Sequence, residues 1–132
     1  MSGFERVKEY LQELGFDFIH EEPDEEVVVI EDEEQGIKHL VIDCESPILI
    51  LEQFIFNLKK KPSETTLKRL LQMNRDVVHG AFAIDDSGEK VLFRDTLQLE
   101  NLDLNELEGS INALSIAMAE HSEELVQFAK EQ

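Results

Sequence analysis

A regular apolar seam near the C-terminus constrains the fold of this chain more than any other feature. Seven apolar side chains and one histidine follow one another in steps of alternately three and four residues. They are Leu104, Leu107, Ile111, Leu114, Met118, His121, Leu125 and Phe128. This spacing predicts one side of a helix that runs from residue 104 to about 129. So long a helix in a chain of 132 residues must cover its seam, either on a sheet of the same chain or on a second copy of itself.

Local signals mark the start of this helix and of two others. Asp103 and Glu106 form a capping box at the beginning of the seam. Ser2 and Glu5 form another at the N-terminus, and Ser63 is a natural N-cap after a proline. Helices are therefore expected at residues 2–14, 64–75 and 104–129.

Segments that are β-branched or alternate between apolar and polar residues predict strands between the helices. They lie at residues 27–31, 37–44, 48–58, 81–85 and 90–97. Gly36 and Gly88 fall in polar turns that join neighbouring strands. The segment 16–22 fits either a short edge strand or a loop. The order α-β-β-β-α-β-β-α predicts one α+β domain over residues 1–132, with an antiparallel sheet.

The segment 48–58 is apolar on both sides of its predicted strand. Alternation puts Ile48, Ile50, Phe54 and Phe56 on one face, and Leu49, Leu51 and Ile55 on the other. A strand of this kind needs cover on both faces. One helix of the chain accounts for one face. The other face needs either a second helix of the same chain or another protein molecule.

The chain is strongly acidic, with 30 Asp and Glu against 12 Lys and Arg and a net charge of −18. This charge repels nucleic acid and anionic membranes, and it suits a basic partner. The one basic island, residues 59–75, lacks the interleaved aromatic side chains of a nucleic-acid site. The longest apolar run, 47–58, is interrupted by Glu52 and Gln53 and is too short to cross a bilayer. No apolar signal core follows the first residues, so we expect a cytoplasmic protein.

Residues that carry chemistry are sparse. The single cysteine, Cys44, excludes a disulfide within the chain, and its acidic neighbours and apolar strand disfavour a reactive thiolate. The four histidines are scattered without a ligand pair at helical spacing, so no metal site is expected. The sequence holds no glycine-rich phosphate loop and no Ser-His-Asp motif. We therefore predict a non-enzymatic protein without catalytic residues, metal or cofactor.

Four short motifs lie in the segment 70-LLQMNRDVVHGAFAIDDSGEKVLFRDTLQLENLDLNEL-107. A Leu-Leu-x-x-Asn helix end is followed by a Gly-x-Phe strand, a Val-Leu-x-Arg strand and a Leu-Asp-x-x-x-Leu helix start. The motif residues are Leu70, Leu71 and Asn74; Gly80 and Phe82; Val91, Leu92 and Arg94; and Leu102, Asp103 and Leu107. This pattern resembles the YbjN-like branch of the type III secretion chaperone-like domains. With the strand pair at 38–58, the likeness covers most of the chain.

The resemblance implies a homodimer that holds an extended segment of a client protein on apolar patches and strand edges. We expect contacts with the partner at Ile50, Phe54 and Phe56. A dimer seam is expected at Leu107, Leu114, Met118 and His121. Burial in the core of one chain explains each of these positions equally well. The alternative function is a YbjN-like cytosolic regulator of signalling or envelope stress without chaperone activity.

Overall fold

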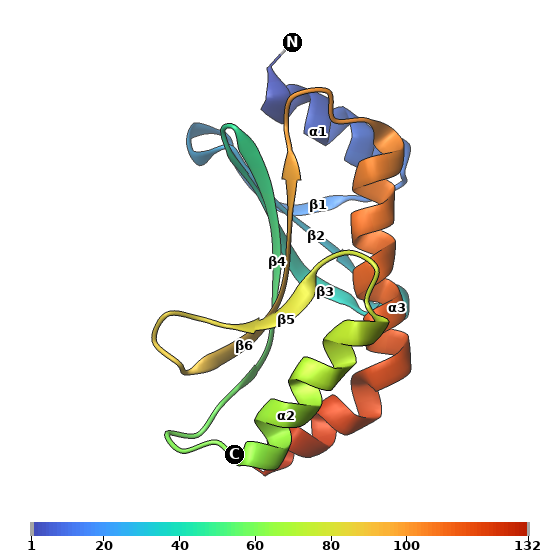
Figure 1. Ribbon diagram of the computed structural model, residues 1–132. Helices are drawn as coiled ribbons and strands as arrows, with labels where there is room; N and C mark the ends of the chain where they lie inside the picture. The colour runs from blue at the N-terminus through green and yellow to red at the C-terminus, as the bar shows by residue number, and fades with distance from the viewer. Residues whose placement is uncertain (1, 132) are drawn as a thin grey trace.

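The computed structural model describes residues 2–131 and shows a layer of helices packed on one face of a sheet (Figure 1). The helices are α1 (Gly3–Glu13), α2 (Glu64–Met73) and α3 (Leu104–Lys130). The strands are β1 (Phe18–Glu22), β2 (Val27–Asp32), β3 (Ile37–Glu45), β4 (Ile48–Asn57), β5 (Ala81–Ile84) and β6 (Lys90–Gln98). The described chain also has short 3-10 turns at η1 (Pro23–Glu25), η2 (Glu33–Gln35) and η3 (Asn74–Asp76).

Each helix begins at the cap that the sequence predicts. In all three, the side chain of the N-cap accepts a hydrogen bond from the backbone N–H three residues later. The N-caps are Ser2, Ser63 and Asp103, with donor–acceptor distances of 3.1, 3.0 and 2.8 Å. Each bond satisfies a donor that the first helical turn leaves unpaired, which contributes about 1 kcal/mol to stability.

The six strands form one antiparallel sheet in the order β1-β2-β3-β4-β6-β5. The segment that the sequence left open between strand and loop forms the edge strand β1. Four strands therefore precede α2, where the predicted order had three. The signal in β1 is weak because the side chains of His20, Glu21 and Glu22 are all exposed, so the strand has no apolar alternation. The α+β class with an antiparallel sheet is confirmed.

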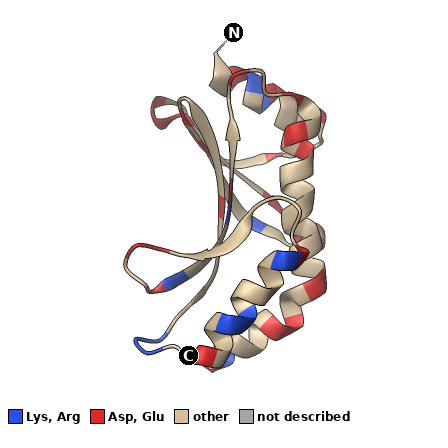
Figure 2. Ribbon diagram, in the orientation of Figure 1, with Lys and Arg blue, Asp and Glu red and all other residues tan. Residues whose placement is uncertain are grey.

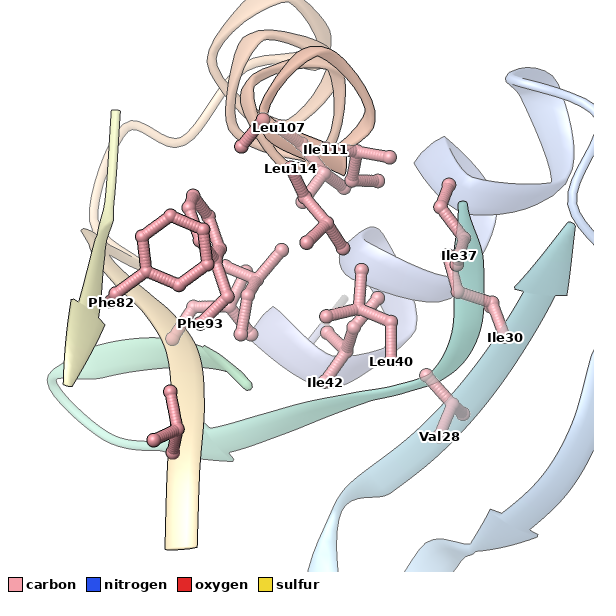
Figure 3. Close-up of a cluster of buried hydrophobic side chains, with 14 of the residues drawn as sticks. Val28, Ile30, Ile37, Leu40, Ile42, Phe82, Phe93, Leu107, Ile111 and Leu114 are labelled. Carbon is pink, nitrogen blue, oxygen red and sulfur yellow. The ribbon is translucent and has the colours of Figure 1, made fainter. Parts of the chain in front are cut away.

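The seam of α3 packs on the helix-covered face of this sheet. Leu107 and Leu114 are at most 1% exposed and face strand residues that include Leu40 and Phe93 (Figure 3). Complete burial of a leucine side chain contributes about 1.5–3 kcal/mol, so this contact is a large part of the core. Of the two partners that the sequence left open for the seam, the structure gives the sheet. Leu107, Leu114 and the 7%-exposed His121 are thus used inside the chain and are not available as a dimer surface.

A β-bulge in β4 changes which face its last residues present. The pairing of β4 with β6 shifts register between Phe54 and Phe56. The extra residue, Ile55, turns the following side chain to the opposite face. Phe54 is 49% exposed, whereas Phe56 is 5% exposed and its ring centroid lies 6.5 Å from that of Phe128. The expectation that Phe56 shares a partner-binding face with Ile50 and Phe54 is therefore wrong.

Gln53 is a buried polar residue inside the apolar run of β4. Its side chain is satisfied on both sides. Nε2 donates to the carbonyl oxygen of Gly36 over 3.0 Å, and Oε1 accepts from the backbone N–H of Lys38 over 3.0 Å. These bonds hold the turn between β2 and β3 against β4. The polar interruption of the run thus has a structural purpose.

Candidate protein-binding surfaces

The sheet face opposite the helices, called here the open face, is the first candidate surface. All three helices of the described chain lie on the other face (Figure 1). In the middle of the open face, β4 presents Ile50, Glu52 and Phe54 at alternate positions. Glu52 forms an ion pair with Arg94 of β6, its direct neighbour across the sheet. The open face therefore has two apolar areas on β4, separated by a paired charge.

The first apolar area surrounds Ile50 and contains an unsatisfied carboxylate. Asp43 of β3 lies directly between Ile50 and Val27 of β2. Its Oδ1 is buried, and no described residue gives it a hydrogen bond. Burial raises the pKa of Asp43 above its ordinary value, and the charge of nearby Glu45 adds to the shift. A ligand that brings an N–H group or a positive charge to this position would remove the cost of the unpaired acceptor.

The second apolar area surrounds Phe54. Leu92 of β6 lies directly opposite it and is half-buried. On its other side, Phe54 reaches a hollow of about 170 Å³ whose lining includes Met118 and Val126 of α3. Val126 is 53% exposed. The structure therefore brings together Phe54 and Met118, which the sequence assigned to two separate surfaces.

A second candidate surface is the groove between α2 and the edge strand β5, called here the α2–β5 groove. It has a volume of about 320 Å³. Its lining is entirely apolar and consists of Leu67, Leu70, Leu71, Phe82, Ala83 and Ile84. Leu71 is 71% exposed and Ile84 is 43% exposed. Leu71 belongs to the Leu-Leu-x-x-Asn motif, but its exposure could not be predicted, because helical spacing alone does not tell a core leucine from an exposed one.

Charge is divided between the two helices at the end of the sheet. Figure 2 shows Lys and Arg on α2 beside Asp and Glu on the adjoining turns of α3. Arg69 Nε and Glu124 Oε2 lie 2.8 Å apart. The basic island of the sequence is thus partly matched by acidic residues of the same molecule. At Arg69, the positive charge is therefore matched within the chain and not offered to a partner.

The nucleophile with the greatest intrinsic reactivity is inert here. Cys44 is buried, and burial together with the nearby charges of Glu26, Asp43 and Glu45 raises its pKa to about 12. His39, on the same strand, is exposed while Cys44 is not, as their spacing predicts. The two residues do not form a joint site. None of the helices in residues 2–131 has the length and apolar character that a membrane crossing requires.

Comparison with known proteins agrees with this architecture. A chain of the heterodimeric ExoU–SpcU complex from the type III secretion system of Pseudomonas aeruginosa is similar, with a TM-score of 0.68, 14% identity and 96% and 99% coverage of the two chains. YbjN from E. coli gives a TM-score of 0.69 at 13% identity, with 93% of each chain covered. The Yersinia pestis type III secretion chaperone SycH, solved in complex with a fragment of YscM2, gives 0.58 at 13% identity, with 96% and 99% covered. Identities this low show a shared fold.

No curated protein matches the sequence. The family model CesT_Tir_1, however, matches residues 1–131, which is nearly the whole chain. The match agrees with the resemblance drawn from the motifs between Leu70 and Leu107, and with the sheet, the helix order and the neighbours in structure. The chain belongs to the CesT_Tir_1 family of type III secretion chaperones.

Proposed function

We propose that this chain is a non-enzymatic, cytoplasmic homodimer that holds an extended segment of another protein on the open face of its sheet. The observation that carries the proposal is the composition of that face. Ile50 and Phe54 form two apolar areas about four residues apart on one strand. A peptide can also address polar groups here: Glu52, paired with Arg94, lies between the two areas, and the unsatisfied Asp43 lies beside Ile50. Membership of a chaperone family and likeness to chaperones solved with their partners support a protein-binding role.

The chemistry of the surface defines the segment that fits. An extended peptide presents alternate side chains to one side, so apolar residues at every second position can reach both apolar areas. A lysine or arginine near Asp43 would meet its unpaired Oδ1. The net charge of −18 also favours a basic segment, because it raises the rate of encounter with cations. We therefore propose a client segment that alternates apolar and basic residues.

The α2–β5 groove is the proposed dimer surface. The α3 seam that the sequence offered for this contact is buried in the core. Leu71 and Ile84 are the exposed apolar residues of the groove. β5 is an edge strand whose outer side bonds to the Asn74 side chain at Phe82 and pairs with no second strand. Exposed apolar groups beside an edge strand are typical of a surface that another chain covers. Two copies of the groove placed together would hide both features at once.

The peptide-binding part is tested with synthetic peptides that alternate leucine and lysine, measured by fluorescence anisotropy at fixed salt concentration. We expect the double variant I50S/F54S to bind at least about tenfold more weakly than the wild type. The control is I116S, which changes a 54%-exposed residue of α3 away from the open face. Equal affinity of I50S/F54S and wild type would remove the open face from the proposal.

The dimer is tested separately by sedimentation equilibrium. We expect a dimeric wild type and a monomeric L71E/I84E variant, since a buried charge without a partner prevents association. I116E is the matched control and should stay dimeric. A wild type that is monomeric at every concentration would rule out the homodimer and leave the peptide-binding proposal standing.

The second candidate function is a cytosolic regulator of signalling or envelope stress without chaperone activity, because YbjN shares the fold. A regulator of this kind binds a folded partner at defined stoichiometry. The two candidate functions differ in the kind of partner that the open face binds. Binding of a short alternating peptide supports the chaperone-like role, and a requirement for an intact folded partner supports the regulator.

A further inference from the structure

Three ligand atoms of metal-binding type meet beside α3, and their residues line neither the open face nor the α2–β5 groove. They belong to Asp76 at the end of η3 and to Glu120 and His121 of α3. All three atoms lie within 4.8 Å of one another. His121 Nε2 is 3.8 Å from Asp76 Oδ2 and 3.8 Å from Glu120 Oε2. Two segments that are far apart in the sequence thus supply one small group of donors.

The imidazole is the observation that distinguishes this group from an ordinary acidic cluster. His121 is only 7% exposed, and its Nε2 has no hydrogen-bond partner among the described residues. A buried nitrogen without a partner costs free energy, and protein structures rarely leave one. The ring packs nearly perpendicular to Phe82, with centroids 6.5 Å apart, so its direction is fixed by the core. Nε2 is therefore held toward two carboxylates without bonding to either.

The carboxylates are suited to complete a coordination shell. The side chains of Asp76 and Glu120 are 58% and 53% exposed, so an ion can enter from solvent and keep water ligands on its outer side. Four ligands at about 2.0–2.2 Å around a tetrahedral ion lie roughly 3.3–3.6 Å from one another. The two separations from His121 Nε2 are 3.8 Å, and the Asp76 and Glu120 oxygens lie within 4.8 Å of each other, so the three atoms form a somewhat wider group. Rotation of the two exposed carboxylate side chains, which solvent leaves free to move, closes the difference.

The donor set selects the class of ion. Calcium and magnesium prefer shells made of oxygen, and a buried imidazole offers them nothing. An imidazole nitrogen with carboxylate oxygens suits zinc and the neighbouring divalent transition metals. From this geometry we infer that Asp76, Glu120 and His121 form a binding site for one zinc-class divalent ion per chain. The inference is independent of the proposed client binding and dimerisation.

The site has a structural consequence for the connection after α2. Asp76 ends η3, which directly follows α2, and residues 77–80 then lead into β5. An ion bound here ties that connection to α3. Binding energy that exists only in the folded chain adds to its stability. Zinc should therefore raise the melting temperature by at least about 3 °C at saturating concentration.

The inference is tested on chelator-stripped protein, titrated with Zn²⁺ in an excess of Mg²⁺ that occupies non-specific acidic sites. Affinity and stoichiometry come from competition with a chromophoric zinc chelator. We expect one tight Zn²⁺ per chain, and a loss of at least about tenfold in affinity in D76N and in E120Q. Both substitutions change exposed side chains, so the apo variants should keep the wild-type melting temperature. H39Q, which alters an exposed histidine of β3, is the control and should bind as the wild type does.

A direct readout of the imidazole completes the test. Two-bond ¹H–¹⁵N spectra report each ring nitrogen, and zinc should shift Nε2 of His121 while leaving His39 unchanged. The inference would be overturned if several equivalents of Zn²⁺ bound weakly and if D76N and E120Q did not change that binding. Such a result would mean that zinc binds non-specifically to the acidic surface. An unshifted His121 at saturating zinc would overturn the inference as well.

Discussion

A side-chain carbon added at Gly36 would lie 2.6 Å from Cβ of Met118, closer than any real contact between such atoms. Gly36 has a φ of +75°, the left-handed region that favours glycine. The turn between β2 and β3 thus approaches α3 as closely as a chain can. The contact couples this turn to the middle of the long helix.

Replacement of Gly36 by alanine should strongly lower the free energy of unfolding for two reasons. A control variant measures one of them alone. The left-handed backbone costs about 1–2 kcal/mol for a residue with a side chain, and the overlap with Met118 adds about 1–3 kcal/mol. Gly88 has a φ of +76° with nothing within 4 Å, so G88A should show only the first cost. Urea denaturation of both variants measures the difference. Equal losses would contradict the close contact.

Gln53 provides a second test of the same turn. In Q53L, the carbonyl of half-buried Gly36 and the N–H of Lys38 lose their partners, at about 1 kcal/mol for each hydrogen bond. We expect a clear fall in the urea midpoint. Q72L, at an exposed position on α2, makes the same chemical change without burial and should differ little from the wild type.

The bulge in β4 predicts opposite results for two phenylalanines that sit two positions apart. F56A should lose about 3–5 kcal/mol of unfolding free energy, because it removes a buried ring from the core. F54A should change the unfolding free energy by less than about 0.5 kcal/mol, because its ring is half exposed on the open face. Similar losses in both variants would mean that the strand has no bulge.

Asp43 predicts a stability that depends on pH with an unusual sign. Its pKa is raised in the folded state, so the folded chain holds the proton more tightly than the unfolded chain does. The carboxylate therefore destabilises the fold at neutral pH, and the penalty fades as pH falls through the raised pKa. D43N should be more stable than the wild type at pH 7, and the gap should vanish below about pH 4, the ordinary value for aspartate.

Asp85 behaves in the opposite way and serves as the comparison. The backbone N–H of Lys90 and other donors lower its pKa. Its contribution is present above the ordinary aspartate pKa and is lost as pH falls through the lowered folded-state pKa. D85N should therefore be less stable than the wild type at neutral pH. A gain in stability in D85N, or a loss in D43N, would contradict these environments.

The features that the sequence predicted well depend on local chemistry. Ser2, Ser63 and Asp103 mark helix starts through bonds to residues three positions later. A helix start of this kind can therefore be recognised from four consecutive residues. The long helix was equally clear, because its seam repeats over 25 residues. The antiparallel α+β class and the family resemblance followed from turn residues, alternation and short motifs. These signals do not require knowledge of what lies across the sheet.

The features that the sequence could not predict depend on pairing between distant segments. The bulge at Ile55 exists because of its register with β6, so strict alternation misplaced Phe56. The burial of the α3 seam was an open choice until the sheet supplied a partner. Asp76 and His121 show no motif in the sequence, because only the packing of η3 on α3 brings their side chains together.

All helices of the described chain cover one side of the sheet. Residues that point to that side stabilise the fold, and residues that point to the other side are free to serve the proposed binding. The outward positions His39, Val41, Asp43 and Glu45 of β3, with the matching positions of β4 and β6, can be exchanged as a set while the hydrophobic interior keeps its composition. The specificity of the proposed client surface can then be engineered without re-optimising stability. The same separation allows related chains to diverge in what they bind and still share one architecture.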